Sequence, residues 1–190
     1  MIFEIYWLNL NTTMRKIQTG MFLFLCISLM CLSSCRKDNE TGPNPFESQD
    51  DGLIENPSEA YQQEMLVLIN EVRSRETNCG GDIFGAAPDV RWDSRLYAAA
   101  LAHATSMYDK GFFSHEGLDG SDVATRVTRE DYNWKNVGEN IAFDFDDVAT
   151  VNTGFENSPT HCRVMNNAAY IEVGVANVGK YWVVVFAAHL

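Results

Sequence analysis

Apolar residues recur every three to four positions early in the chain, which is the spacing of one helix face. The first such stripe consists of Tyr61, Met65, Leu68, Ile69 and Val72. It follows Asn56-Pro57-Ser58-Glu59, where Asn as N-cap, Pro at the first helical position and Glu at the third predict a helix start. We expect this helix to end before Cys79-Gly80-Gly81.

A second helix is predicted after Trp92, with Asp93 as its N-cap and Lys110-Gly111 as its end. One face carries Leu96, Ala100, His103 and Met107, so we expect His103 to be a core histidine. Shorter helices are predicted over 121–130, capped by Asp119-Gly120-Ser121, and over 146–157. We expect Pro159 to interrupt or end the latter.

Three segments have the composition of strands, namely 136–143, 171–178 and 181–188. Gly179-Lys180 leaves room for only a tight turn, so the last two strands should form an antiparallel hairpin. The run Trp182-Val183-Val184-Val185-Phe186 is apolar on both faces and needs a covering layer on each side. The pattern therefore predicts an α+β fold, a three-layer α/β/α sandwich with a small central antiparallel sheet.

The first part of the chain has the pattern of an export signal. Arg15 and Lys16 precede an apolar run from Met21 to Leu32, which is too short to span a bilayer but fits a signal-peptide core. Met14 is the better initiator, because the preceding segment is unlike a signal peptide. Leu32-Ser33-Ser34-Cys35 resembles a bacterial lipobox, in which the cysteine is lipidated and attaches the protein to a membrane surface. The alternative is an ordinary cleaved signal.

These features divide the chain into a lipoprotein signal peptide (1–34), a lipid-anchored flexible linker (35–56) and a folded domain (57–190). The linker is polar and turn-rich, with no apolar periodicity. Acidic residues shortly after Cys35 resemble the surface-export signals of some Gram-negative lipoproteins, although a solvated tail would have the same composition. We expect an exported envelope protein at the outer membrane or cell surface.

Charge and composition limit the classes of molecule that the chain can bind. The 190 residues carry a formal net charge of −12, and no basic face suited to phosphate backbones is visible, so we expect no nucleic acid partner. Hydrophobic residues make up 46% of the chain, which is enough for one globular core.

Two cysteines, Cys79 and Cys162, remain after the signal and Cys35 are set aside. An even number in an exported protein favours a disulfide, and free thiols are the alternative. The bond would close a long loop, for which chain-entropy estimates give roughly 4 to 5 kcal/mol.

The residues with the clearest chemistry are Glu139, in the run Gly138-Glu139-Asn140-Ile141, and two flanking histidines, His115 and His161. Alternation along the strand places Glu139 with Val137 and Ile141, where a carboxylate needs a cation or a donor. We expect His115 and His161 to meet it. Imidazole and carboxylate are ligands for divalent metals and also groups for acid–base chemistry. Separate placement for packing or solvation is the alternative.

Motifs in order along the chain resemble the CAP superfamily (cysteine-rich secretory, antigen 5 and pathogenesis-related 1 proteins), also called SCP-like extracellular domains. The resemblance runs from about Tyr61 to Phe186. Its pieces are Ile69-Asn70-Glu71-Val72-Arg73, Trp92, Ala104-Thr105-Ser106-Met107, Phe113-Ser114-His115, Gly138-Glu139-Asn140-Ile141, Ser158-Pro159-Thr160-His161-Cys162, Met165-Asn166, Glu172-Val173-Gly174-Val175 and Tyr181-Trp182. The resemblance implies an α/β/α sandwich, in agreement with the pattern above.

The resemblance also implies a cleft in which two histidines and two glutamates can hold a divalent cation. His115, Glu139 and His161 match three of these positions, but Phe155 replaces a tryptophan of the family and Ser158 stands at the second glutamate. Glu156 lies nearby but would face away. Three ligands with an open position suit zinc or another exchangeable divalent cation. A hydrogen-bonded His–Glu–His cluster without metal is the alternative.

Three functions follow as expectations. The first is a non-enzymatic binding module whose His/Glu cleft takes a lipid, glycan or protein ligand. The second is a metal-assisted hydrolase of peptidase type with Glu139 as the candidate catalytic residue, although the missing second acid removes a natural general base. The third is a structural envelope protein.

Overall fold

The computed structural model describes residues 57–190. The predicted signal peptide, the linker and the proposed lipidation site Cys35 lie outside the described residues. None of the helices within 57–190 is long and apolar enough to cross a membrane.

A four-stranded sheet lies at the centre of the domain, with the strand order β3-β5-β6-β4. Its strands are β3 (Arg91–Trp92), β4 (Trp134–Phe143), β5 (Glu172–Val178) and β6 (Tyr181–His189). Both β4 and β5 pair antiparallel with β6, and short β3 joins β5 in parallel. The predicted hairpin is confirmed, and Gly179 makes its turn with a φ of 59°.

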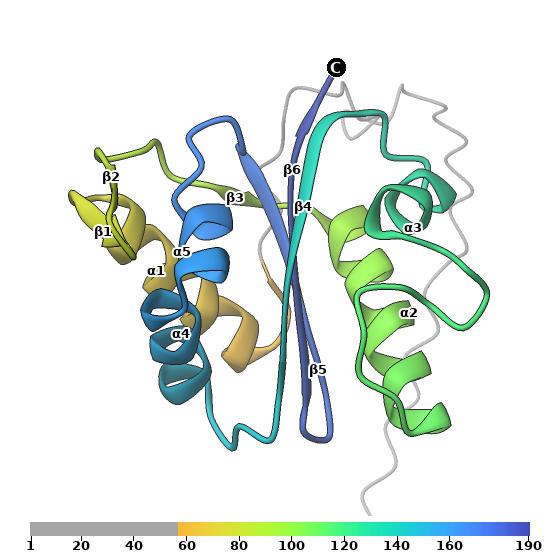
Figure 1. The fold of residues 1–190 in the computed structure, drawn as a ribbon. Coiled ribbons are helices and arrows are strands. Elements are labelled where there is room, and N and C mark those ends of the chain that lie inside the picture. Colours follow the sequence, from red (N-terminus) through yellow and green to blue (C-terminus); the bar gives the residue numbers. More distant parts are fainter. Residues whose placement is uncertain (1–56) are drawn as a thin grey trace, which may run out of the picture. The chain divides into compact units, whose positions relative to one another are not determined.

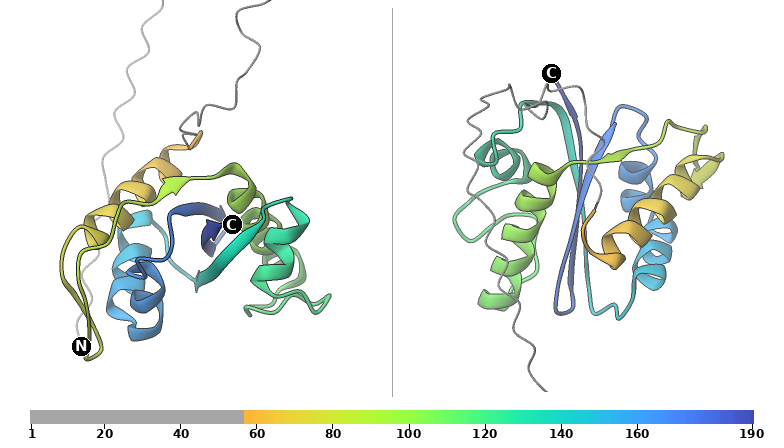
Figure 2. Two further views of the ribbon diagram at one scale, coloured as in Figure 1. Left: turned by 90° about the horizontal axis from the view of Figure 1, so that it is seen from above. Right: turned by 180° about the vertical axis from the view of Figure 1, so that it is seen from behind.

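Helices cover both faces of this sheet. Helices α1 (Ala60–Arg73), α4 (Val148–Asn157) and α5 (Pro159–Met165) lie on one face, and α2 (Ser94–Lys110) and α3 (Val123–Arg129) lie on the other (Figures 1 and 2). The predicted α+β fold with three layers is confirmed, but the sheet is mixed and not purely antiparallel, because β3 pairs parallel with β5.

Alternate residues of β6 supply the two cores, as period-two geometry requires. Trp182, Val184 and Phe186 pack in the core under α1 and α4, whereas Val183 and Val185 pack in the core under α2. Helix α2 can approach the sheet closely because β5 has a glycine at 174, where an added Cβ would collide with the backbone of Leu96 and Tyr97.

Helix ends follow the predictions in part. Asp93 caps α2 by accepting hydrogen bonds from the amides of Arg95 and Leu96, and Gly111 ends it with a φ of 66°, as expected. The predicted start of α1 is wrong, because Glu59 occupies the N-cap position and the helix begins at Ala60. The predicted cap of α3 is also wrong, because the side chain of Asp122, and not Asp119-Gly120-Ser121, accepts from the Thr125 amide.

Several short elements were not predicted. Pro159 stands at the first position of α5 and so begins a new helix after α4, a position that its missing N–H tolerates. The hairpin of β1 (Thr77–Cys79) and β2 (Asp82–Phe84), and the two-residue β3, are too short to show periodicity.

Two long-range links join α1, β1 and α5. The predicted disulfide between Cys79 and Cys162 is present, with the Cα atoms 5.4 Å apart, so it ties β1 to α5. Arg73, at the end of α1, is fully buried, and its guanidinium donates to the carbonyls of Pro88, Met165, Asn167 and Tyr170. These links restrain the backbone that carries His161.

Candidate functional site

Glu139 lies on β4 and points toward α3. Its side chain is 2% exposed, so its charge depends on protein partners. His115 Nδ1–H donates to Oε1 over 2.8 Å, and Arg126 Nη2–H donates to Oε2 over 2.7 Å. Both carboxylate oxygens are therefore engaged, one by an imidazole and one by a guanidinium.

Arg126 is the partner of Glu139 that the sequence interpretation missed. It lies on α3, is 6% exposed at its side chain, and also donates to the carbonyls of Ser121 and His115. A signal for it existed in the sequence, because Arg126 adjoins Val127 on the inward face of a helix that the apolar pattern predicted. A buried carboxylate on the neighbouring strand needs such a cation.

His115 lies in the loop between α2 and α3 and is 58% exposed at its side chain. Because Nδ1–H donates to Glu139, Nε2 is the ring nitrogen that remains for a further partner. The imidazole and Glu139 line an open hollow of about 390 Å³ that also includes Gly120, Asp122 and Thr125.

His161 lies on α5 and is placed by Asn140, the residue after Glu139. Asn140 Nδ2–H donates to the His161 carbonyl over 3.0 Å. Consecutive strand residues point to opposite faces of a sheet, so Glu139 and the contact to His161 lie on opposite faces of β4. Burial, and secondarily the charge of His115, lowers the pKa of His161 below its usual value. The ring is therefore neutral at neutral pH.

An apolar hollow of about 280 Å³ opens beside the His161 ring. We call it the aromatic hollow, after Phe113, Phe143, Phe145 and Phe155, which line it together with His161. The Phe155 and His161 rings meet edge to face at 5.2 Å. Phe113 and Phe143 are each about half exposed and form its rim. Exposed phenylalanines at the mouth of a hollow are typical of binding sites.

The structure brings His115 to Glu139 but does not assemble the predicted three-ligand cation site. Within 57–190, no group of three or more His, Cys, Asp or Glu side chains is placed to hold a metal ion. His115 and Arg126 occupy the two carboxylate oxygens of Glu139, Arg126 adds a positive charge there, and His161 makes no hydrogen bond to Glu139 within these residues. The donor set therefore does not fit a resident metal with these three ligands.

The remaining histidines have structural partners. His103 is buried as predicted, its Nε2–H donates to the Ser114 carbonyl, and burial lowers its pKa. His189 is partly exposed, but Nδ1–H donates to buried Glu172, a contact that the sequence did not suggest. Burial would raise the pKa of Glu172, but hydrogen bonds from Tyr132, His189 and Arg91 outweigh it and lower the pKa.

A three-layer domain with a disulfide-tied α5 and a His–Glu pair at an open hollow defines the class of SCP-like extracellular domains. The model of the cysteine-rich secretory protein family (CAP) matches residues 66–186. The chain therefore belongs to this family.

Similar proteins are known from several bacteria. An extracellular protein of Bacillus anthracis that contains an SCP domain is 26% identical, with a TM-score of 0.60 over 67% of this chain and 40% of that one. An outer surface protein of Borrelia burgdorferi is 18% identical, with a TM-score of 0.56 over 67% of this chain and 92% of that one, and shares the fold.

Among curated proteins, an uncharacterized membrane protein of Bacillus subtilis, YlbC, is 27% identical over 121 residues. The match covers 64% of this chain and 32% of the relative, so this chain corresponds to about a third of that protein.

Proposed function

We propose that this protein is an exported, lipid-anchored binding module that takes the apolar part of a ligand into the aromatic hollow. The observation that carries the proposal is the hollow itself, in which four phenylalanines surround a space that ends at the neutral ring of His161. Apolar walls supply affinity, and the His161 imidazole and the Ser158 hydroxyl give hydrogen-bonding points that can orient the ligand. A lipid or an apolar side chain of a protein fits this lining better than a glycan does.

The arrangement around Glu139 favours binding over hydrolysis. A general base needs a carboxylate oxygen that can accept a proton from water. Both oxygens of Glu139 are already acceptors, for His115 and for Arg126, and the second family glutamate is replaced by Ser158. A metal-assisted peptidase remains the second candidate, because His115 offers a free Nε2 at an open hollow.

Fluorescence of N-phenyl-1-naphthylamine, a neutral apolar probe, tests the binding proposal on the full-length chain. We expect saturable 1:1 enhancement that falls at least tenfold in affinity in the Phe113→Ala/Phe143→Ala variant, which removes the rim. Tyr108→Ala is the matched control, since Tyr108 is equally exposed but does not line the hollow. Enhancement without saturation, or equal loss in the control, would contradict the proposal.

A divalent cation at His115, Glu139 and His161 stays a prediction, and zinc analysis after dialysis checks it. Because Arg126 neutralises Glu139 and the three groups are not assembled, we expect less than one equivalent to be retained. One tightly held equivalent that is lost in both His115→Ala and His161→Ala would restore the original three-ligand prediction. Peptide cleavage that disappears in Glu139→Gln would favour the hydrolase.

Membrane attachment through Cys35 is proposed from the sequence and has its own test. The related B. anthracis protein is extracellular and the B. subtilis relative is a membrane protein, which supports export of this chain. Metabolic labelling with an alkynyl fatty acid should mark the wild-type chain and not Cys35→Ala. Equal labelling of both would contradict the anchor.

A further inference from the structure

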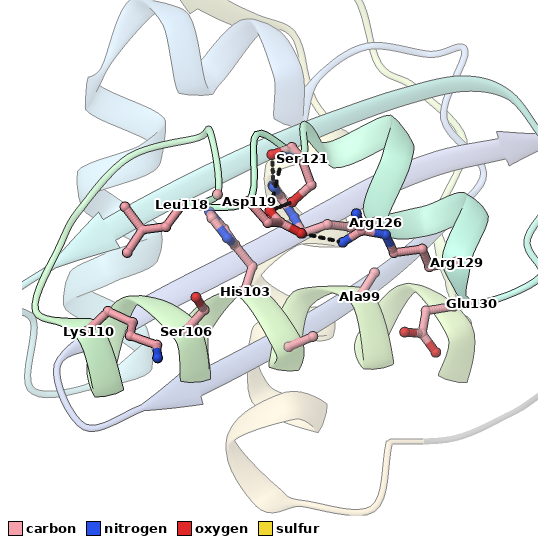
Figure 3. Close-up of a pocket in the computed structure, with 12 residues that line it drawn as sticks. Ala99, His103, Ser106, Lys110, Leu118, Asp119, Ser121, Arg126, Arg129 and Glu130 are labelled. Atoms are coloured by element: carbon pink, nitrogen blue, oxygen red, sulfur yellow. Dashed lines mark hydrogen bonds and ion pairs between the residues drawn. The ribbon is translucent and has the colours of Figure 1, made fainter.

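A separate hollow of about 480 Å³ lies between α2, α3 and the loop that joins them. Figure 3 shows its lining, with α2 below and the loop and α3 above. We call it the α2–α3 hollow. It shares no residue with the aromatic hollow or with the hollow in front of His115.

Helix α2 presents a mixed face to this hollow. Ala99, His103, Ser106 and Lys110 follow one another at intervals of three to four residues and so lie along one side of the helix. Ala99 and the neighbouring Ala102 leave an apolar floor without large side chains, whereas Ser106 and Lys110 offer polar groups at one end (Figure 3). The floor suits the flat body of a small molecule.

Cations gather around the hollow in a chain that is otherwise acidic. Lys110, Arg126 and Arg129 line it, and they are three of the ten lysines and arginines in residues 57–190. Arg126 pairs with Glu139 behind the hollow, and Arg129 pairs with Asp119. Lys110 makes no ion pair with another residue of 57–190. Glu130 lies at the opposite end of the α2 floor (Figure 3).

Arg126 retains unused hydrogen-bonding capacity. The residue is 5% exposed, and its Nε atom is buried without a hydrogen-bond partner among the described residues. A buried donor without a hydrogen bond is unfavourable, and in native proteins water, an ion or a ligand accepts the hydrogen bond from such a donor. The Nη atoms of Arg126 already donate to Ser121, His115 and Glu139, so Nε–H is the donor that remains for a carboxylate or phosphate oxygen.

We propose that the α2–α3 hollow binds a small organic anion, a carboxylate or phosphate ester with a compact apolar body. Its anionic oxygens accept from Arg126 Nε and from Arg129, and its body lies over Ala99 and Ala102. Lys110 adds long-range attraction at the mouth. This site is independent of the aromatic hollow and of the function proposed for it.

Four probes that share a ring and differ in the head group test the proposal. Benzoate and phenyl phosphate are the anions, benzamide is neutral and benzylamine is a cation. Each is titrated into the ¹⁵N-labelled full-length chain, and the Arg126 Nε–H signal and the α2 amides are followed by NMR. We expect at least one anion to bind saturably and to shift the Arg126 Nε–H signal, with benzamide and benzylamine at least tenfold weaker.

Two variants at exposed positions test the location without disturbing Arg126. Ala102→Leu places a larger side chain on the floor of the hollow, and we expect it to weaken anion binding at least tenfold. Lys110→Gln removes the positive charge at the mouth, and we expect it to weaken anion binding about threefold. Ala149→Leu on α4 and Lys135→Gln on β4 are the matched controls, both exposed and outside the hollow, and should leave affinity unchanged.

Three results would overturn the proposal. The first is no saturable binding of either anion, and the second is equal affinity for benzylamine. The third is anion binding that survives Ala102→Leu but is lost in Phe113→Ala/Phe143→Ala, since the probe would then occupy the aromatic hollow. Failure of naphthylamine binding alone would leave the α2–α3 hollow intact, so the two proposals fail separately.

Discussion

The two faces of strand β4 carry different chemistry, although the residues that define them are adjacent in the chain. On one face, Glu139 is held by His115 and Arg126 in a network of charged groups. On the other face, Asn140 donates to the backbone carbonyl of His161, whose neutral ring lines the aromatic hollow. This hollow lies at the edge of β4 and is lined from both faces of the strand, by Ile141 and Phe143 on the Glu139 side and by Ala142 on the other. The charge network stabilises the loop between α2 and α3, and the aromatic hollow can take a ligand.

This difference shows that two neighbouring residues of one motif can serve separate sites. Edge strand β4 has α2 and α3 on one side and α4 and α5 on the other, so each residue of Gly138-Glu139-Asn140-Ile141 belongs to one layer. Gly138 is required by yet another contact, because an added Cβ would collide with the Tyr170 hydroxyl. The residues of this motif therefore contact different layers of the fold and do not form a single site.

Removing the cation from the Glu139 face should have the largest effect on stability. Arg126→Met leaves the carboxylate of Glu139 buried without its guanidinium, and breaking a buried pair in this way costs about 3–5 kcal/mol of unfolding free energy. Urea denaturation measures the loss. The double variant Arg126→Met/Glu139→Leu should recover most of it, because no charge is then left unpaired. A loss below about 1 kcal/mol in the single variant would contradict the burial of this pair.

Removing the disulfide should destabilise the domain and change the local structure on the His161 face. The Cys79→Ser/Cys162→Ser variant removes a cross-link between residues 83 positions apart. Loss of such a bond typically lowers the unfolding free energy by about 2–5 kcal/mol. We expect the NMR signals of His161, the residue before Cys162, to move, while those of His115 stay in place. Equal movement of both rings would show that the two faces are coupled.

The sequence was sufficient for the layers because they follow from long periodic segments. Each of α1 and α2 has one apolar face, which indicates the side that packs on the sheet. Strand β6 is apolar on both faces, which indicates that helices cover both sides of the sheet. The cysteine count predicted the bond between Cys79 and Cys162. Short elements such as β3 and α5 were not predicted, because two to seven residues are too few to show a recognisable periodicity.

The site was predicted less well, for a reason that lies in strand geometry. The sequence correctly placed Glu139 on the face of Val137 and Ile141 and predicted His115 as its partner. It assigned the second partner to His161, the other histidine that flanks the strand along the chain. The spacing of motifs along the chain carries no information on which side of a strand a distant loop returns to, so Arg126 was overlooked.

Loss of the Asn140 side chain should give a moderate effect confined to the apolar face. Asn140→Ala removes the donor to the His161 carbonyl, which we expect to cost about 1–2 kcal/mol. The cost should add to that of Glu139→Gln within about 0.5 kcal/mol, as for independent sites. Thermal or urea denaturation of both single variants and the double variant checks this. A larger coupling energy would mean that the faces do not act separately.

The smallest effect concerns the pH dependence of His161. Its folded pKa is lowered, so the unfolded state binds more protons between the folded pKa and the unfolded value of about 6.5. His161 therefore contributes stability that is present above about pH 6.5 and is lost as pH falls toward the folded pKa. Urea denaturation between pH 5 and 7.5 should show a shallower slope in His161→Gln.

Because the charge of His115 contributes to this lowering, His115→Ala should raise the pKa of His161 toward its usual value. An NMR titration of the His161 ring measures the change, and His189→Ala serves as the control that should leave it in place. An unchanged His161 pKa in His115→Ala would place the two rings beyond electrostatic reach of each other.

The most direct test of ligand binding in the aromatic hollow is to observe which histidine ring signals change when an apolar ligand is added. Histidine ring NMR signals of the full-length chain are followed while N-phenyl-1-naphthylamine is added. We expect the His161 signals to shift in a saturable manner while the His115 signals keep their positions, because the His161 ring lines the aromatic hollow and the His115 ring does not. Saturable movement of His115 with an unmoved His161 would contradict it.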